Sequence, residues 1–153
     1  MSIDETMTIE NYIPHRAAAR LIDRLISADD EHVLVEAEVP RQGRFVRDGV
    51  MPTWVGIEYM AQAIAAWAGA KARRRGKPVR LGLLLGTRKF EIRRATLPAG
   101  ATLRIHARRE MLADNGLGMF ECRILLGDDE VASAMVSVFE PADAMSYLGG
   151  AAA

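Results

Sequence analysis

Residues 54–70 read WVGIEYMAQAIAAWAGA, and this stretch decides how the rest of the chain must be arranged. Apolar and small residues lie on every side of the helix that it predicts, except for Glu58 and Gln62. A helix that is hydrophobic all round belongs inside a core or a membrane. The stretch is slightly short for a membrane span and contains a carboxylate, so we expect a central core helix and no membrane span.

Glu58 and Gln62 are four residues apart and therefore share one face of the predicted helix. A carboxylate in a core must find a partner or take up a proton, because its burial without one is costly. Burial also raises the pKa of a carboxyl group, which suits a general acid. Two interpretations stay open from these residues: a catalytic acid, or a Glu–Gln pair that is hydrogen-bonded for structural support.

The flanking sequence predicts one helix within a set of strands. Thr53 is a plausible N-cap, the helix continues to about Arg75, and Gly76 is placed for the C′ position before Pro78. A short helix or turn is expected at 9–16, and Asp114-Asn115-Gly116 is a strong hairpin signal. Alternating apolar residues predict strands at 21–27, 33–39, 80–92, 101–109, 120–126 and 131–140.

Two strands before the helix and four after it indicate an α+β protein, in which an antiparallel sheet packs on the helix. We expect one domain over residues 1–153, with a core at about 9–141 and a frayed tail after Pro141. One sheet cannot surround such a helix completely. We therefore expect a second copy, or a related chain, to cover the remainder.

Composition narrows the class of protein. Lysine plus arginine (20) equals aspartate plus glutamate (20), which argues against a general nucleic-acid binder. The lone cysteine, Cys122, forms no internal disulfide and is expected to be buried and inert. The acidic, polar N-terminus is unlike a signal peptide and favours a cytoplasmic protein. We expect no metal site, because no cysteines or histidines have ligand spacing, and no cofactor.

Residues 43–62, GRFVRDGVMPTWVGIEYMAQ, resemble the central motif of the FabA/FabZ-type 3-hydroxyacyl-ACP dehydratases, which have the hotdog fold. Segments 13–25 (IPHRAAARLIDRL) and 87–103 (TRKFEIRRATLPAGATL) resemble two further motifs of that family. The chain is more narrowly similar to dehydratase-like proteins encoded with aryl polyene biosynthesis genes. Residues that match the central motif are Gly43, Phe45, Met51, Pro52, Glu58, Ala61 and Gln62.

The resemblance implies that Glu58 protonates the leaving hydroxyl, with Gln62 orienting it, at a site shared with a partner subunit. The catalytic histidine of the family falls on Arg44, with the proline and glycines around it also changed. Arginine cannot act as a base at ordinary pH, although it can bind a carboxylate or polarise a carbonyl. The role of Arg44 therefore stays open, and His15, His32 and His106 are expected to be structural.

Further substrate contacts are expected near the start of the helix. Backbone N–H groups of residues 53–56, which include Thr53, Trp54 and Gly56, could stabilise an oxyanion on a thioester. Phe45, Met51, Trp54 and Tyr59 could line an acyl tunnel, although core packing is the simpler explanation for each. The C-terminus of the helix is surrounded by a cationic cluster, which is either a solvated helix end or a dock for acyl carrier protein (ACP). Its members are Lys71, Arg73, Arg74, Arg75, Lys77 and Arg80, of which Arg73, Arg74, Arg75 and Lys77 are the expected docking residues.

The leading interpretation is a dehydratase that acts on 3-hydroxyacyl-ACP in a fatty-acid-like or polyene pathway, assembled as a homodimer or as a heteromer with a related hotdog chain. Two alternatives remain. The chain is a non-catalytic or half-site partner of an active dehydratase, or it is a hotdog acyl thioesterase.

Overall fold

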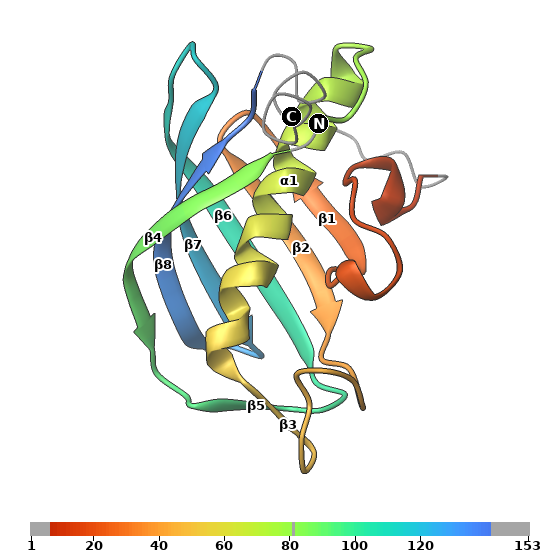
Figure 1. The fold of residues 1–153 in the computed structure, drawn as a ribbon, viewed down its shortest axis with the longest axis vertical. Helices are drawn as coiled ribbons and strands as arrows, with labels where there is room; N and C mark the ends of the chain where they lie inside the picture. The colour runs from red at the N-terminus through yellow and green to blue at the C-terminus, as the bar shows by residue number, and fades with distance from the viewer. Residues whose placement is uncertain (1–6, 81, 142–153) are drawn as a thin grey trace, which may run out of the picture.

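The computed structural model describes residues 7–80 and 82–141. It shows an antiparallel sheet curved around one long helix, α1 (Figure 1). The helix spans Gly56–Arg74 and follows a short 3-10 helix, η3, at Thr53–Val55. Two further 3-10 helices, η1 and η2, lie at Ile9–Asn11 and Ala17–Ala19. The strands are β1 (Arg24–Ala28), β2 (His32–Glu38), β3 (Val50–Pro52), β4 (Leu83–Ile92), β5 (Thr96–Pro98), β6 (Thr102–Leu112), β7 (Leu117–Leu126) and β8 (Asp129–Phe139).

The main sheet has the strand order β1-β2-β6-β7-β8-β4, and every neighbouring pair is antiparallel. These six strands correspond to the six that the sequence predicts, so the predicted α+β arrangement is confirmed. Strands β3 and β5 form a separate pair that the sequence did not reveal, because three residues are too few to show a period. The predicted frayed tail after Pro141 lies outside the described residues.

The inner face of the sheet packs against α1, and small residues on α1 allow close approach. A Cβ atom added to Gly56 would lie 2.6 Å from Cδ1 of Ile124 on β7. A Cβ atom added to Gly69 would lie 1.7 Å from the backbone oxygen of Tyr12. Cys122 on β7 is fully buried, and burial raises the pKa of its thiol, which agrees with the expected inert role.

The C-terminal end of α1 is as predicted. Gly76 has a φ of 66°, its N–H donates to the Arg73 carbonyl, and the Lys77 N–H donates to the Ala72 carbonyl. These bonds form a Schellman motif.

The predicted N-cap at Thr53 was wrong, because Thr53 opens η3. Its hydroxyl donates to the Arg94 carbonyl at 2.6 Å and its N–H donates to the Ala95 carbonyl at 3.0 Å. Pairing of β3 with β5 brings these partners alongside Thr53.

One side of α1 is left uncovered by its own sheet. Ile57, Ala61, Ala65 and Ala68 are only half-buried, and Glu58 is exposed. The predictions of an all-round buried helix and of a buried Glu58 were therefore wrong for the isolated chain, because the sheet closes around the other side of the helix. The described residues include no helix with the length and apolar character that a membrane span requires.

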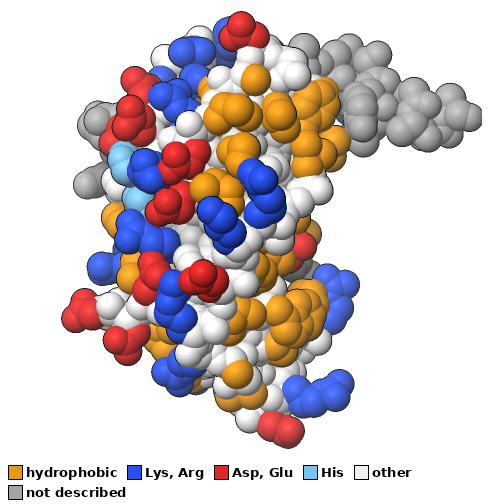
Figure 2. Space-filling model, turned by 90° about the vertical axis from the view of Figure 1, so that its left-hand side faces the viewer, with side chains coloured by type: hydrophobic (Ala, Val, Ile, Leu, Met, Phe, Trp, Pro, Cys, Tyr) orange, Lys and Arg blue, Asp and Glu red, His pale blue; other side chains and the backbone are white. Residues whose placement is uncertain are grey.

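Strand β4 borders this uncovered side and is an edge of the sheet. Its apolar side chains Leu84, Leu85 and Ile92 are 40%, 57% and 43% exposed. Figure 2 views the side on which β4 and β8 lie in Figure 1, and hydrophobic side chains gather there around a few cations. An edge strand with exposed apolar residues is a ready surface for a second chain.

Candidate active site

Two cavities flank the N-terminal half of α1, and they share no lining residue. The Arg44 cavity has a volume of about 450 Å³ and is lined by residues of the 40–46 loop, by Met51 and by Tyr59. The Glu58 cavity, about 160 Å³, lies between the uncovered side of α1 and strands β4 and β8. Glu58 and Tyr59 are consecutive, so their side chains leave the helix about 100° apart and enter different cavities. Within one chain, Glu58 and Arg44 therefore do not meet.

Arg44 lies at the mouth of its cavity as part of a stack of side chains. Its guanidinium lies over the Phe45 ring, 4.9 Å from the centroid, and Phe45 meets Trp54 edge to face at 6.0 Å. Trp54 is 57% exposed, which is unusual for so large an apolar side chain. The structure thus brings together three of the predicted site residues, with a cation–π contact holding the first.

The floor of the Arg44 cavity is formed by Met51 and Tyr59, both fully buried. The Tyr59 hydroxyl donates to Sδ of Met51 at 3.8 Å. Burial raises the pKa of Tyr59 to about 12, so its phenol stays neutral. This cavity therefore has an apolar floor, and the charged residues in its lining are of both signs: Arg20 and Arg44, Asp23 and Glu38.

Most of the wall of the Glu58 cavity is apolar, formed by residues such as Ala61, Ala65 and Leu83. His15 also lines this cavity. Burial lowers the pKa of His15 below its usual value, the negative charge of Glu58 acts in the opposite direction, and Arg16 lowers it further. A carboxyl group and a neutral imidazole in one small, mostly apolar space can exchange or share a proton.

Gln62 has a structural role, but with partners that the sequence did not predict. Its Oε1 accepts hydrogen bonds from the N–H groups of Leu21 (2.8 Å) and Ile22 (3.4 Å), and its Nε2 donates to the Ala19 carbonyl at 2.6 Å. The amide is thus bonded to the 19–22 segment rather than to Glu58. These bonds also explain why β1 begins at Arg24 instead of Leu21.

The N–H groups expected to stabilise an oxyanion are partly engaged. Thr53 donates to Ala95, and Gly56 donates to the carbonyls of Thr53 and Trp54. The close approach of Ile124 gives Gly56 a packing role. The start of the predicted helix was expected to supply oxyanion donors at residues 53–56, and two of those four groups already have partners.

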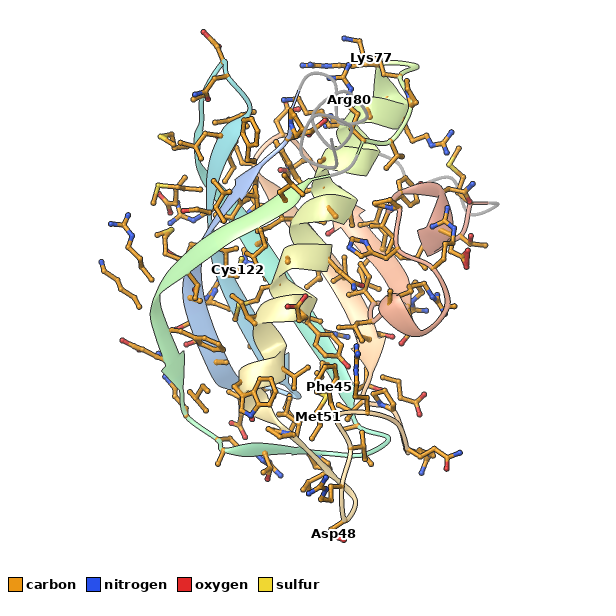
Figure 3. The ribbon with its side chains drawn as sticks, in the orientation of Figure 1. Phe45, Asp48, Met51, Lys77, Arg80 and Cys122 are labelled. Carbon is orange, nitrogen blue, oxygen red and sulfur yellow. The ribbon has the colours of Figure 1, made fainter. Side chains whose placement is uncertain are left out.

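The residues of the cationic cluster fall into two groups, those bonded to other parts of the chain and those that line a cavity. Arg73 donates to the Asn11 carbonyl at 2.8 Å, and Arg74 pairs with Asp30 at 3.2 Å. Arg75 and Lys77 instead line a third cavity of about 180 Å³ together with Lys71 and Arg80. Figure 3 shows Lys77 and Arg80 at one end of α1 and Phe45 and Met51 at the other.

The other two histidines meet on the outer face of the sheet. Nδ1 of His32 on β2 lies 3.1 Å from Nε2 of His106 on β6. These two histidines are 74 residues apart in the sequence, so their contact could not be predicted from it. Within residues 7–80 and 82–141, no group of three or more His, Cys, Asp or Glu side chains is arranged to hold a metal ion.

Comparison with known proteins shows the family to which this chain belongs. A sequence model described as ApeP-like, ApeP dehydratase, matches residues 7–149, so the chain belongs to the ApeP-like dehydratase family. It is 34% identical over 144 residues to the 3-hydroxyacyl-[acyl-carrier-protein] dehydratase FabZ of Thermus thermophilus, covering 90% of this chain and 95% of that protein. The FabZ of Psychrobacter arcticus is 25% identical over 138 residues, which are 86% of this chain and 92% of that protein.

The solved structures give the same assignment. A chain of the dehydratase heterocomplex ApeI:P from Xenorhabdus doucetiae superposes with a TM-score of 0.85 and 29% identity, covering 94% of this chain and 96% of that one. The predicted hotdog fold is therefore confirmed. A hypothetical thioesterase protein from Streptococcus pneumoniae, with coenzyme A, has a TM-score of 0.59 over 76% of this chain and 86% of that one, at 13% identity. That similarity shows the fold alone.

Proposed function

We propose that this chain is one subunit of a dehydratase that removes water from 3-hydroxyacyl thioesters of ACP, at a site formed with a second hotdog chain. The observation that carries the proposal is the position of Glu58, exposed on the side of α1 that the chain's own sheet leaves open. A second chain seated on β4 and this side of α1 would enclose Glu58. The resemblance of the fold to a chain of a dehydratase heterocomplex supports a related partner.

In the proposed reaction, a group of one chain removes a proton and a group of the other chain donates one. A base removes the proton from the carbon next to the thioester, the bond from the neighbouring carbon to the hydroxyl breaks, and Glu58 donates the proton that turns the hydroxyl into water. Arg44 cannot be that base, because the pKa of a guanidinium exceeds about 12. In this proposal the base beside Glu58 comes from the second chain. Arg44, which lies in the separate cavity, is left to bind an anionic or carbonyl group there.

Charge at the other end of α1 supports a partner with acidic character. Lys71, Arg75, Lys77 and Arg80 converge on one cavity, whereas Arg73 and Arg74 are held by bonds within the chain. We propose the first four as the surface that attracts ACP, by local positive charge on a chain with no net charge. Cytoplasmic localisation is part of the same proposal.

The direct test is incubation with a 3-hydroxyacyl-ACP, followed by mass spectrometry of the acyl chain. The chain is assayed alone and with a hotdog protein that carries an intact G-H-F motif. Loss of water that requires both chains would support the proposal. Release of free acid would contradict it and would favour the thioesterase alternative. Full dehydration by the second chain alone, unchanged by this chain, would also contradict it.

Assembly should depend on β4. We expect Leu84→Asp to weaken association, with itself or with a partner, on the order of 10²-fold, because the carboxylate would have to be buried in an apolar contact. Leu112→Asp, on the tip of the β6–β7 hairpin, is the matched control: the two leucines are 40% and 41% exposed. Sedimentation velocity over a concentration series measures the effect. Equal behaviour of the two variants would argue against β4 as the interface.

Arg44 should be the reason why the isolated chain dehydrates poorly. We expect Arg44→His to raise the dehydratase rate of the self-associated chain at least about tenfold, since general-base catalysis contributes about 10²–10⁴-fold. Arg44→Ala should give no gain, and Arg47→His, in the same exposed loop, controls for a histidine placed nearby. Progress curves for the four proteins are compared. Robust turnover by the wild type, unaffected by both Arg44 changes, would mean that the base lies elsewhere.

A further inference from the structure

His15 carries an unexplained polar atom. Its Nδ1 is buried and has no hydrogen-bond partner, and among the described residues it is the sole side-chain nitrogen or oxygen in that state. Buried polar groups in folded proteins are almost always paired, so each exception calls for an explanation. One explanation is that the hydrogen-bonding group for Nδ1 takes up its position only when a second chain or the substrate binds.

The backbone around His15 is held firmly. The Arg16 guanidinium donates to the carbonyls of Glu10, Ile13 and His15 at 2.9, 2.7 and 2.8 Å, and it pairs with the Glu10 carboxylate at 3.1 Å. Gln62 fixes the next segment, 19–22, to α1. Because the backbone is bonded both before and after His15, its imidazole is kept at the wall of the Glu58 cavity.

Glu58 is the complementary group. It lines the same cavity, and no hydrogen bond or ion pair holds its carboxylate among residues 7–80 and 82–141. Other charged groups here are Arg16, Arg80 and Glu140. Arg16 is occupied by Glu10, and Arg80 lies toward the C-terminal end of α1, whereas Glu58 is in its first turn (Figure 3).

We propose that His15 is a positioning residue for Glu58. In the assembled site its imidazole hydrogen-bonds one carboxyl oxygen and leaves the other to face the substrate. This role rests on the proposed function of Glu58 as the acid. With its proton on Nδ1, a neutral imidazole donates to one carboxyl oxygen, whether the other oxygen carries a proton or not. It can therefore hold the carboxyl group both before and after the other oxygen gives its proton to the leaving hydroxyl.

Neutrality of the imidazole is favoured by its surroundings. Burial is the main cause that lowers the pKa of His15, and Arg16 adds to it, while Glu58 opposes both. At neutral pH the ring is therefore uncharged, and the bond to Glu58 is not a full ion pair. Such a bond orients the carboxyl group without making its proton much harder to move.

The first test needs no activity and so can fail independently of the proposed function. NMR titration of the three histidines measures the pKa of His15 in wild type, Glu58→Gln and Arg80→Gln. We expect Glu58→Gln to lower the pKa of His15, because the negative charge that opposes the effect of burial is lost. Arg80→Gln should not lower it, and His32 and His106 serve as internal controls. An unchanged pKa of His15 in Glu58→Gln would overturn the proposal.

The second test separates positioning from packing. His15→Asn keeps an N–H donor close to the place of Nδ1, whereas His15→Leu fills the space without one. In the active complex, we expect His15→Leu to lower kcat about tenfold with little change in KM, and His15→Asn to stay within about threefold of wild type. Equal losses of kcat in both variants, at unchanged melting temperature, would overturn the proposal. If His15→Leu fails to fold, a tenfold loss in folded His15→Asn would do so.

Discussion

Glu58→Gln is expected to lower kcat of the assembled dehydratase by a factor on the order of 10² or more, while the protein folds as before. Glutamine keeps the shape and hydrogen-bonding capacity of the side chain but has no proton to give to the leaving hydroxyl. Glu58 is exposed in the isolated chain and makes no bond among the described residues, so the substitution should cost little stability.

The measurement is turnover of a 3-hydroxyacyl-ACP by the complex, with the melting temperature recorded for each variant. Glu31→Gln is the control, since Glu31 is an exposed carboxylate in the β1–β2 turn, outside the three cavities described above. A folded Glu58→Gln variant with the activity of the wild type would remove the acid role. The same loss in Glu31→Gln would point to a nonspecific effect of charge.

Gly69→Ala is expected to destabilise the protein by about 3 kcal/mol or more, although alanine is the better helix former by about 1 kcal/mol. The added Cβ would lie 1.7 Å from the Tyr12 oxygen and 2.6 Å from its carbonyl carbon. Both atoms belong to the backbone, so no side-chain rotation relieves the clash. Either α1 or the 9–13 segment must move, and both are packed in the core through Tyr12, Ile13 and Ala70.

Urea unfolding of Gly69→Ala and of two further glycine variants measures this cost. Gly56→Ala should lose less, because its neighbour at 2.6 Å is the flexible end of Ile124. Gly86→Ala, where nothing lies within 4 Å of the added atom, should change the free energy of unfolding by less than about 1 kcal/mol. Equal stability of Gly69→Ala and wild type would mean that the 9–13 segment does not lie against α1.

Elements with a local signal could be predicted from the sequence. Six strands were found by alternation, α1 by its apolar stretch, and the helix end by Gly76, because these features depend on neighbours a few residues away. The turn at residues 114–116 was also predicted, and Gly116 there has a φ of 95°. Strands β3 and β5 were missed, since each is defined by its pairing with the other and not by its own pattern.

Long-range bonds changed the roles of several residues that the sequence had singled out. Thr53 binds the segment that precedes β5, and Gln62 binds residues 19–22. Polar side chains of this kind satisfy whichever backbone groups the fold brings to them. The sequence spacing suggests a helix cap at Thr53 and a Glu–Gln pair at Gln62. It does not show which distant segments of the chain will lie beside these two side chains.

The sequence by itself determined the class of fold, because an apolar helix needs a sheet to cover it. It also singled out Glu58, the one carboxylate within that stretch, which we propose as the acid. Only the tertiary structure decided that Glu58 and Arg44 enter separate cavities, that Glu58 is exposed, and that His15 shares its cavity. The reason is geometric. Consecutive side chains diverge around a helix, and the sheet that shields one side of it leaves the opposite side to whatever chain binds there.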